Sequence, residues 1–372
     1  MKITILGAGM VGRVMALDLA TQFSVLAVDR DLSRLEMLQG YDGITTRHAD
    51  LADSRHIEQV IADCDLVIGA VPGYMGYRTL ETVIRCGKNI VDISFFNEDP
   101  FTLHKLACEK GVIAIVDCGV APGMGNIILG YYNQQIKINR FECYVGGLPL
   151  IRTWPFEYKA PFSPIDVLEE YTRPARLVEN GALVIKPALS EPELLNFPGI
   201  GTLEAFNTDG LRSLLTTMNI PNMKEKTLRY PGHIEIMRIF RETGFFGTEK
   251  IDINGSAVRP LDVTTKLLFP LWKLAETEHE FTVMKIILTG TDKHGDCLVE
   301  YDMLDRYDEK TGISSMARTT GYTCTAAARL VLNGDYRNKG ISPPERLGED
   351  EKCFIKMLDD LAAHNIHYIK SK

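Results

Sequence analysis

The sequence predicts an α/β protein with a doubly wound parallel sheet at its N-terminus. An apolar run rich in β-branched residues, Ile3 to Leu6, leads directly into Gly7-Ala8-Gly9-Met10-Val11-Gly12 and then into a helical pattern. A second apolar run, 24–28, ends at Asp29, about 20 residues beyond the second glycine, as a dinucleotide-binding fingerprint requires. Residues 1–120 alternate strands with helices, which is typical of a parallel sheet covered on both faces. Together these observations indicate an N-terminal Rossmann domain.

Each glycine of the fingerprint has its own expected role. Gly7 permits the tight turn, Gly9 lets the backbone approach a pyrophosphate, and Gly12 lets the helix pack against the strand. The phosphates are expected at the helix N-terminus, where unpaired N–H groups favour negative charge. Asp29 is expected to accept hydrogen bonds from the adenosine ribose and to repel a 2′-phosphate, which favours NAD over NADP. Arg30 leaves NADP open, because its side chain is able to pair with that phosphate or to stack on the adenine.

The ends of the expected strands define the rest of the cofactor site. After Asp29 we expect strands at 45–49, 66–69, 89–92 and 112–116. In an open parallel sheet the ligand lies over the carboxyl ends of the strands. The predicted cofactor-binding residues are therefore Gly7, Ala8, Gly9, Met10, Val11, Gly12, Asp29, Arg30, Asp50, Leu51, Val71, Pro72, Ser94, Gly119 and Pro122. Between the strands we expect a helix at 32–38 capped by Asp31, one capped by Ser54, one that ends at Gly87, and one from near Pro100 to Gly111.

From Arg140 onward the pattern changes to longer alternating strands with hairpin signals. Asn-Gly pairs at 180–181 and 254–255 and the His-Gly pair at 294–295 predict hairpins. Helices are expected from Ser163, from about Asp209, from Gly232 to Gly244, and from Pro260. The region lacks a glycine fingerprint, so we interpret it as an α+β substrate and oligomerisation domain.

Near residue 316 the pattern becomes helical again. The small apolar helix expected at 319–332 suits close packing, and we interpret it as the chain returning to complete the first domain. The predicted boundaries are 1–122 and 316–348 for a discontinuous Rossmann domain, 123–315 for the inserted domain, and 349–372 for a C-terminal helix and short strand.

Composition restricts the class of partner. The 372 residues are 45% hydrophobic and 24% charged, and the net charge of −8 argues against nucleic acid or an anionic membrane. No apolar run reaches membrane-spanning length. The eight cysteines form no CxxC pair and no metal-like cluster with His, so we expect buried reduced thiols, a cytoplasmic protein and no bound metal.

Candidate catalytic and substrate-binding groups concentrate in two segments, 156–163 and 227–233. His233 is expected to open a helix, whose dipole would keep the imidazole a neutral base; alternatively it packs beneath that helix. Arg229 lies in an apolar strand beside Tyr230, where a cation calls for an anionic partner such as a substrate carboxylate. Lys159 and Glu157 are either site residues or solvated strand charges.

Between these segments, 203–212 is expected to present a helix N-terminus with Asp209, which is either a ligand site or an ordinary helix cap.

Several segments resemble the saccharopine dehydrogenase-like family. They are the opening fingerprint, DCGVAPGM at 117–124, YVGGLP at 144–149, Glu157-Tyr158, LEAF at 203–206, KTLRYPGH at 226–233 and MAR at 316–318. Within the family the chain is most similar to the lysine 6-dehydrogenases. Saccharopine reductases carry a Leu-Asp-Pro-Gly-Ile-Asp-His type segment where this chain has Ala121 and Gly125 in place of the two aspartates.

The resemblance implies a dimer or tetramer that oxidises a lysine-like amine through an imine to a semialdehyde. In that reaction Arg229 or Arg212 would hold the carboxylate, and Glu157 or Asp209 would favour the α-ammonium, with Tyr158 beside them. His233 or Lys159 would accept a proton. Asp117 would orient the amine. The alternatives are a saccharopine or carboxynorspermidine type reductase that forms a secondary amine, and a catalytically silent NAD-binding protein.

Overall fold

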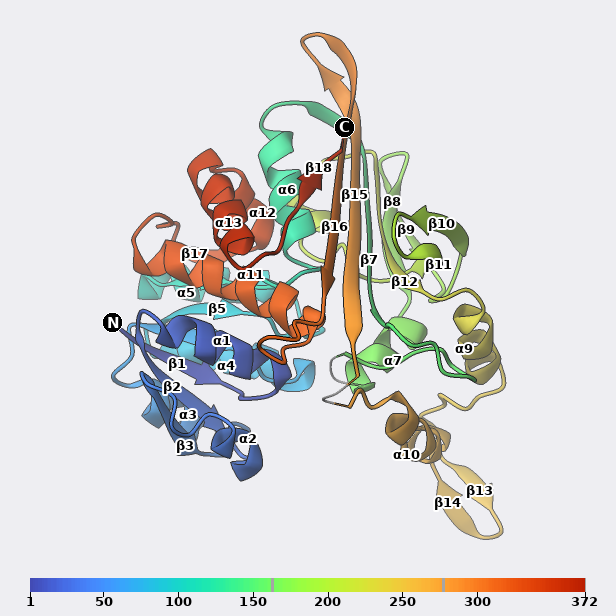
Figure 1. Cartoon of the computed structure of the whole chain (residues 1–372), viewed down its shortest axis with the longest axis horizontal. Helices are drawn as coiled ribbons and strands as arrows, with labels where there is room; N and C mark the ends of the chain where they lie inside the picture. The colour runs from blue at the N-terminus through green and yellow to red at the C-terminus, as the bar shows by residue number, and fades with distance from the viewer. Residues whose placement is uncertain (162–163, 276–277, 372) are drawn as a thin grey trace. The chain divides into compact units, whose positions relative to one another are not determined.

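The computed structural model describes residues 1–161, 164–275 and 278–371, and the chain divides into two compact units (Figure 1). Unit 1 comprises Met1–Ile136 and Met316–His367, and unit 2 comprises Lys137–Ser315 and Tyr368–Lys372. The first unit is discontinuous, and it extends to 136 rather than 122. It also includes the C-terminal helix, because that helix packs on elements of unit 1.

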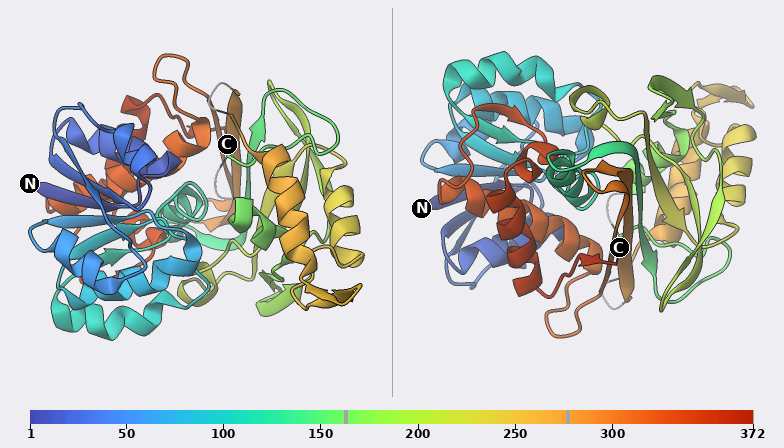
Figure 2. Two further views of the ribbon diagram at one scale, coloured as in Figure 1. Left: turned by 90° about the horizontal axis from the view of Figure 1, so that it is seen from below. Right: turned by 90° about the horizontal axis from the view of Figure 1, so that it is seen from above.

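Unit 1 is built on a seven-stranded, entirely parallel sheet in the order β17-β6-β5-β4-β1-β2-β3. Figure 2 shows helices on both of its faces, which confirms the predicted fold class. The strand order reverses between β1 and β4, and such a switch point is where ligands bind in this architecture. Six strands lie close to their predicted positions. The strands are β1 Lys2–Leu6, β2 Ser24–Asp29, β3 Ile44–His48, β4 Leu66–Gly69, β5 Asn89–Asp92, β6 Ile113–Ile115 and the unpredicted β17 Gly340–Ser342.

The helices of unit 1 follow the predicted signals, with one correction. Asp31 caps α2 by accepting from the Ser33 amide, and α5 ends at Gly111 in the left-handed conformation, both as predicted. The cap of α3 is Asp53 rather than Ser54, since the Asp53 carboxylate accepts from the Arg55 amide. The helices are α1 Met10–Ala20, α2 Leu32–Glu36, α3 Ser54–Ile61, α4 Gly73–Arg85, η1 Pro100–Leu103, α5 His104–Lys110, α6 Met124–Asn133, α11 Ser315–Leu332, α12 Pro344–Gly348 and α13 Glu351–Ala363.

Two glycines let α6 and α12 cross at backbone contact, which explains why α6 belongs to unit 1. A Cβ atom at Gly130 would lie 2.1 Å from the Glu345 carbonyl oxygen, and one at Gly348 would lie 1.9 Å from the Ile127 carbonyl oxygen. The Asn126 amide also donates to the buried Glu345 carboxylate at 3.1 Å. These contacts fix α6 to the C-terminal part of the same unit.

A partly buried ionic cluster joins α1, α11 and α13. Arg329 donates to Asp18 at 2.8 Å and to Asp360 at 2.9 Å. The two ring nitrogens of His364 lie 2.8 Å from Asp18 Oδ1 and 2.7 Å from the Asp360 carbonyl oxygen. Burial opposes protonation of His364, but the hydrogen bond and the charge of Asp18 outweigh it and raise the pKa of His364 above its usual 6.5. The cluster therefore favours an imidazolium.

A histidine whose pKa is raised by folding stabilises the native state when it is charged. This contribution is complete below the unfolded pKa and is lost as the pH rises through the folded pKa. We expect His364→Gln to lower the free energy of unfolding by about 1 kcal/mol near pH 5.5 and by less near pH 9. Urea unfolding at both pH values measures this, with the exposed His367→Gln as control. An equal loss at both pH values would contradict the assignment.

Unit 2 contains a nine-stranded mixed sheet and a separate two-stranded hairpin. The hairpins predicted at Asn180-Gly181, Asn254-Gly255 and His294-Gly295 are confirmed as β8–β9, β13–β14 and β15–β16. The strands are β7 Lys137–Pro149, β8 Ala175–Glu179, β9 Ala182–Lys186, β10 Glu193–Phe197, β11 Gly201–Asn207, β12 Asn222–Arg229, β13 Ile251–Ile253, β14 Ser256–Val258, β15 Glu280–Asp292, β16 Gly295–Arg306 and β18 Ile369–Lys370. The helices are α7 Pro164–Thr172, α8 Leu214–Thr217, α9 His233–Glu242 and α10 Pro260–Trp272.

The predicted helix from about Asp209 is wrong. Residues 201–207 form strand β11, and the short α8 begins only at Leu214. Asp209 instead binds the Arg176 guanidinium through both carboxylate oxygens, at 2.8 Å each, so it is not a helix cap. The expected cap Ser163 lies outside the described residues.

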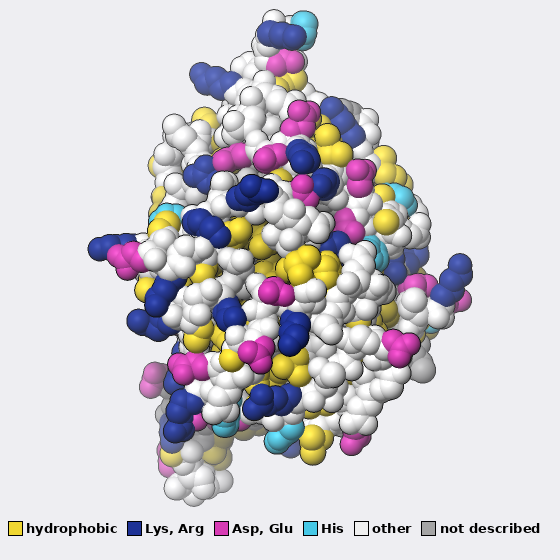
Figure 3. Space-filling model, turned by 90° about the vertical axis from the view of Figure 1, so that its left-hand side faces the viewer, with side chains coloured by type: hydrophobic (Ala, Val, Ile, Leu, Met, Phe, Trp, Pro, Cys, Tyr) yellow, Lys and Arg dark blue, Asp and Glu magenta, His cyan; other side chains and the backbone are white. Residues whose placement is uncertain are grey.

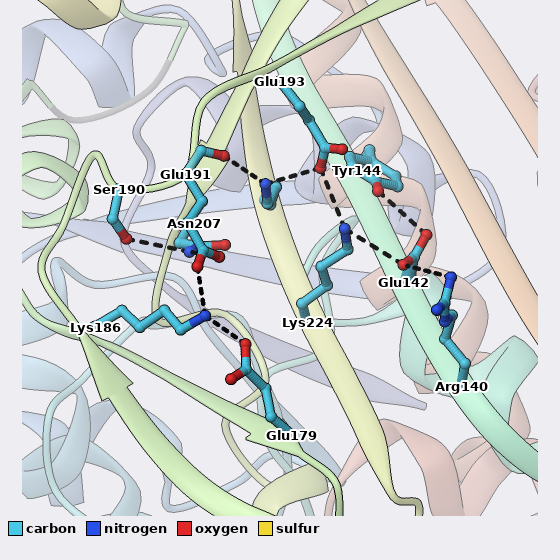
Figure 4. A network of polar contacts seen from close by, with 11 residues as sticks. Arg140, Glu142, Tyr144, Glu179, Lys186, Ser190, Glu191, Glu193, Asn207 and Lys224 are labelled. Atoms are coloured by element: carbon cyan, nitrogen blue, oxygen red, sulfur yellow. Dashed lines mark hydrogen bonds and ion pairs between the residues drawn. The ribbon is translucent and has the colours of Figure 1, made fainter.

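One face of the unit 2 sheet carries a chain of alternating charges (Figure 4). Lys226, which is buried, donates to Glu193 at 2.8 Å and to the Glu191 carbonyl oxygen at 2.6 Å. Lys224 links Glu193 to Glu142, at 3.2 and 3.3 Å. Every cation named here thus has a carboxylate partner, and we interpret the network as a structural link between β7, β10 and β12.

The distribution of charged side chains on the surface agrees with the net charge of −8. On the face drawn in Figure 3, Lys and Arg side chains are interspersed with Asp and Glu side chains. No helix within the described ranges is long and apolar enough to cross a membrane. The expectation that all the cysteines are buried is wrong for Cys86 and Cys108, which are exposed, and for Cys297, which is partly exposed.

Candidate functional site

The glycine turn after β1 has the geometry that the fingerprint predicts. Gly7 has a φ of +108°, and a Cβ atom there would lie 2.4 Å from the Ala70 carbonyl oxygen. A Cβ atom at Gly12 would lie 1.9 Å from the Gly7 carbonyl oxygen. Gly9 differs, because the nearest atom to its Cβ position is Arg34 Nη1, at 3.6 Å. Gly7 and Gly12 are therefore required by the fold. At Gly9 the fold does not require glycine, so the space beside it is available to a ligand.

The N-terminus of α1 adjoins this space. Gly9 is its N-cap, and no side chain caps the helix. Met10, at the first helical position, is half-exposed. The first N–H groups of an α-helix lack intrahelical partners and favour an anion such as a phosphate. The free space at Gly9 and the uncapped helix thus fit the pyrophosphate of a dinucleotide.

Asp29 lies beside the turn with its side chain largely buried. Its Oδ2 accepts from the Ala8 amide at 2.8 Å, and its Oδ1 accepts from the Asp31 amide at 2.9 Å. Arg34 Nη1 lies 3.5 Å from Asp29 Oδ2, and Arg34 Nε lies 3.5 Å from Asp31 Oδ2. The acidic group expected to face the ribose is therefore paired with a cation from α2. The sequence analysis missed Arg34, although its place one helical turn after Asp31 is a usable signal.

The other predicted cofactor residues lie at the ends of their strands. Asp50 is exposed, whereas the side chains of Leu51 and Val71 are buried in the core of unit 1. Pro72 is the exposed N-cap of α4. Arg30 is exposed, and its carbonyl oxygen lies 3.0 Å from His48 Nε2. For Leu51 and Val71, contact with a cofactor would involve mainly the backbone.

A buried carboxylate that the sequence analysis missed holds the turn after β5. Asp92 is fully buried and accepts from the Ser94 amide at 2.8 Å and from the Ser94 hydroxyl at 3.3 Å. A Cβ atom at Gly69 would lie 1.8 Å from Asp92 Oδ2. Asp92 therefore positions Ser94, one of the predicted cofactor residues. Its place at the last residue of a strand was the available signal.

The loop between β6 and α6 is tightly folded. Asp117 is buried with a φ of +53°, an uncommon conformation that often marks functional positions. The Gly119 amide donates to the Pro122 carbonyl oxygen at 3.0 Å. Gly123 has a φ of +147°, and a Cβ atom there would lie 1.7 Å from the Gly119 carbonyl oxygen. Burial, together with the charges of Asp117 and Asp92, raises the pKa of the Cys118 thiol to about 12, so this cysteine stays a thiol.

In unit 2, three of the predicted site residues do come together, but in the interior. Arg229 is 2% exposed and donates to Glu170 at 2.6 Å and to the Tyr171 hydroxyl at 3.1 Å. The Tyr158 ring lies 4.3 Å beneath its guanidinium carbon. His233 Nε2 lies 2.9 Å from the Tyr171 hydroxyl. The anion that Arg229 requires is thus supplied by the protein.

His233 has the helix position that the sequence predicts, at the start of α9. Its Nδ1 lies 2.8 Å from the Phe156 carbonyl oxygen, so both ring nitrogens have protein partners. Burial and the neighbouring Arg229 lower the pKa of His233 to about 3. The imidazole is therefore neutral, as expected, but buried. This geometry opposes a role for His233 or Arg229 in direct contact with substrate.

The remaining predicted residues of unit 2 lie nearer the surface or in other pairs. Lys159 Nζ lies 3.4 Å from Glu278 and 3.5 Å from the Lys273 carbonyl oxygen. Glu157, with a φ of +49°, accepts from Arg152 at 2.6 Å. Arg212 is buried with a φ of +50°. Among these residues Lys159 and Glu157 have the more accessible charges.

Comparison with known proteins assigns the family. The family model described as the saccharopine dehydrogenase NADP binding domain matches residues 3–115, and that described as the saccharopine dehydrogenase C-terminal domain matches residues 119–366. The chain belongs to the saccharopine dehydrogenase family. It is thus a member of a family of oxidoreductases that act on amino-acid amines and bind a pyridine nucleotide through the N-terminal domain.

Two solved structures share the fold of this chain. Saccharopine dehydrogenase (L-Glu forming) from Saccharomyces cerevisiae superposes with a TM-score of 0.81 at 18% identity, covering 100% of this chain and 99% of that one. A homospermidine synthase from Legionella pneumophila, in complex with NAD, superposes with a TM-score of 0.67 at 11% identity, covering 100% and 91%. At these identities the likeness establishes the architecture alone.

Curated relatives are distant and differ in length. Alpha-aminoadipic semialdehyde synthase from Arabidopsis thaliana is 25% identical over 60% of this chain but only 23% of its own length. Saccharopine dehydrogenase [NADP(+), L-glutamate-forming] from Schizosaccharomyces pombe is 22% identical over 98% of this chain and 97% of its own. The chain therefore spans less than a quarter of the first of these proteins and nearly all of the second.

Proposed function

We propose that the chain is an NAD-linked dehydrogenase that oxidises the ε-amine of L-lysine or a similar amino acid. The C–H bond beside the nitrogen breaks, its hydride reduces the nicotinamide, and a proton leaves the nitrogen, which yields an imine. Water then hydrolyses the imine to the semialdehyde and ammonia. The observation that carries this choice is the loop between β6 and α6. Ala121 in that loop and Gly125 in the first turn of α6 stand where the saccharopine reductases that the chain resembles have aspartates.

We assign the residue roles from accessibility, except at Asp117, which is buried and is assigned from its backbone geometry. The uncapped N-terminus of α1 and the space at Gly9 support pyrophosphate binding, and Asp29 supports contact with the ribose. In unit 2 we assign the proton acceptor to Lys159, whose side chain is 19% exposed, rather than to His233, which is buried with both ring nitrogens engaged. We assign Asp117 to orient the amine, since its strained backbone is held in place by a tight loop.

Steady-state kinetics test the reaction directly. With NAD present, L-lysine is expected to give NADH and free ammonia in equal amounts, and ornithine less. Saccharopine and carboxynorspermidine, which are secondary amines, are expected to give neither. A response to a secondary amine alone would reject the proposal.

The second candidate is a saccharopine-type reductase, which joins an amine to a carbonyl compound. Relatives named saccharopine dehydrogenase that align over nearly the whole chain favour it. In the oxidative direction it would release an amino acid rather than ammonia. Measuring ammonia alongside NADH therefore separates the two candidates.

The preference for NAD over NADP rests on Asp29, but the positive charge of Arg34 beside it reduces this preference. A 2′-phosphate would be repelled by Asp29 and attracted by Arg34, which lies 3.5 Å away. We expect Arg34→Ala to weaken NADPH binding about fivefold relative to NADH, the size of one exposed charge pair. Isothermal titration with each reduced nucleotide measures this. Arg30→Ala is the matched variant, and a shift with Arg30→Ala but not with Arg34→Ala would contradict the assignment.

A further inference from the structure

The strand order of unit 1 determines over which strands the two halves of a dinucleotide lie. From β1 the chain passes through α1 to β2, and from β4 it passes through α4 to β5, away from the switch point in the opposite direction. Right-handed crossovers in opposite directions place their helices on opposite faces of the sheet, so the ligand-binding crevice of this architecture lies between the start of α1 and the start of α4. Asp29, the expected partner of the adenosine ribose, ends β2. The nicotinamide half is therefore expected over the end of β4.

The loops that follow β1 and β4 touch each other at this point. A Cβ atom at Gly7 would lie 2.4 Å from the Ala70 carbonyl oxygen, and the Ala70 amide donates to the Leu6 carbonyl oxygen at 2.9 Å. The loop after β4 leads at once into α4, whose N-cap Pro72 makes no side-chain hydrogen bond. A nucleotide bound at the turn after β1 therefore reaches the first turn of α4.

The first turn of α4 directs Tyr74 away from the core. Gly73 and Gly76 are buried on the inner side of the helix. A Cβ atom at Gly76 would lie 2.7 Å from both Ser94 Cβ and Phe96 Cδ1, so this side of α4 is pressed against the segment that follows β5. Tyr74, by contrast, is 75% exposed. Its ring is therefore available to a ligand.

Arg78 shows which way the Tyr74 side of α4 faces. Arg78 follows Tyr74 by four residues, so the two lie on one side of the helix, and its Nε donates to the Ser54 hydroxyl of α3 at 3.1 Å. Helix α3 packs on β1, where the Thr4 hydroxyl donates to the Val60 carbonyl oxygen at 3.2 Å. The Tyr74 side of α4 thus faces β1 rather than β5. Because helical side chains lean toward the N-terminus, the Tyr74 ring extends toward the carboxyl ends of β1 and β4.

We infer that Tyr74 packs against the nicotinamide ring of the bound nucleotide. The inference rests on nucleotide binding by unit 1 and not on the choice of substrate. A tyrosine ring offers a flat apolar face on which another ring stacks, and that face carries partial negative charge. The nicotinamide ring is a cation in oxidised NAD and neutral in NADH. The contact therefore favours the oxidised form, since a cation is attracted to an aromatic face.

Isothermal titration with NAD, NADH and ADP-ribose tests the contact. ADP-ribose has the adenosine, the pyrophosphate and the second ribose but no nicotinamide ring. Tyr74→Leu removes the aromatic face, and we expect it to raise the dissociation constant about fivefold for NAD, about twofold for NADH and not measurably for ADP-ribose. Tyr74→Phe keeps the face and is expected to bind all three as the wild type does. Both variants should fold, because the side chain is largely exposed.

Tyr41→Leu is the matched control. Tyr41 is 53% exposed and lies between α2 and the amino end of β3, at the edge of the sheet opposite the ligand. It is expected to leave the affinity for all three nucleotides unchanged. Equal losses of affinity for NAD and ADP-ribose in Tyr74→Leu would overturn the inference. So would an unchanged affinity for NAD, or a Tyr74→Phe variant that binds NAD no better than Tyr74→Leu. A wild type that binds none of the three would reject the nucleotide site itself, and the inference with it.

Discussion

The Gly9→Ala variant is expected to fold normally and to lose most of its affinity for the nucleotide. Gly9 has an extended backbone, with φ −67° and ψ −168°, that any residue adopts, and the nearest protein atom to its Cβ position is Arg34 Nη1, in ordinary van der Waals contact at 3.6 Å. In the nucleotide complex that position is where the pyrophosphate approaches the backbone. An added methyl group there costs about 1–3 kcal/mol of overpacking, which corresponds to roughly a 5- to 150-fold rise in the dissociation constant.

Gly12→Ala is the informative comparison, because its methyl group would meet the Gly7 carbonyl oxygen rather than the ligand. We expect it to lower both the melting temperature, by several degrees, and nucleotide affinity. Thermal unfolding without nucleotide and isothermal titration with NADH separate the two effects. If Gly9→Ala bound NADH as the wild type does, the assignment of the site would be wrong.

The N-terminal fold was predictable because several local signals agree there. The glycine turn, Asp29 and the strand ends each predict the same parallel-sheet arrangement. Six strands lie near their predicted positions. Strand β17 was not predicted. It has three residues and follows the irregular segment 333–339 after α11, so its place in the sheet depends on tertiary contact with β6 rather than on a pattern of its own.

In unit 2 the local signals were weaker. The Asn-Gly hairpins were found because the turn requires those residues. Asp209 looked like a helix cap, but Asp is equally suited to an ion pair, and its partner Arg176 lies 33 residues away in the sequence. Sequence proximity alone cannot distinguish these roles.

The sequence predicted which residues of unit 2 lie together in the candidate site, but not that they are buried. Tyr158, Arg229 and His233 were singled out together, and the structure brings them together. What the sequence did not reveal is Glu170, which lies on α7 and neutralises Arg229 within the core. A cation in an apolar strand indicates that an anion is near it. Whether that anion is a ligand or a side chain depends on the fold.

This distinction leads to the second prediction. Arg229 is a buried cation held by one carboxylate, that of Glu170, whose side chain is 23% exposed. Glu170→Ala would leave the guanidinium buried without its counter-charge, and removing one partner of a buried ion pair costs about 3 kcal/mol or more. We therefore expect a lower melting temperature and a clear loss in the free energy of urea unfolding.

Glu169→Ala is the matched control for this variant. Glu169 is the preceding residue of α7, its side chain is 44% exposed, and it pairs with Arg173 at 3.0 Å across one helical turn. Such a surface pair contributes about 0.5 kcal/mol or less. Equal unfolding free energies for Glu170→Ala and Glu169→Ala would mean that Arg229 does not depend on Glu170 for its counter-charge. Arg229 would then again be a candidate for the residue that binds a substrate carboxylate, since its charge would be available to a ligand.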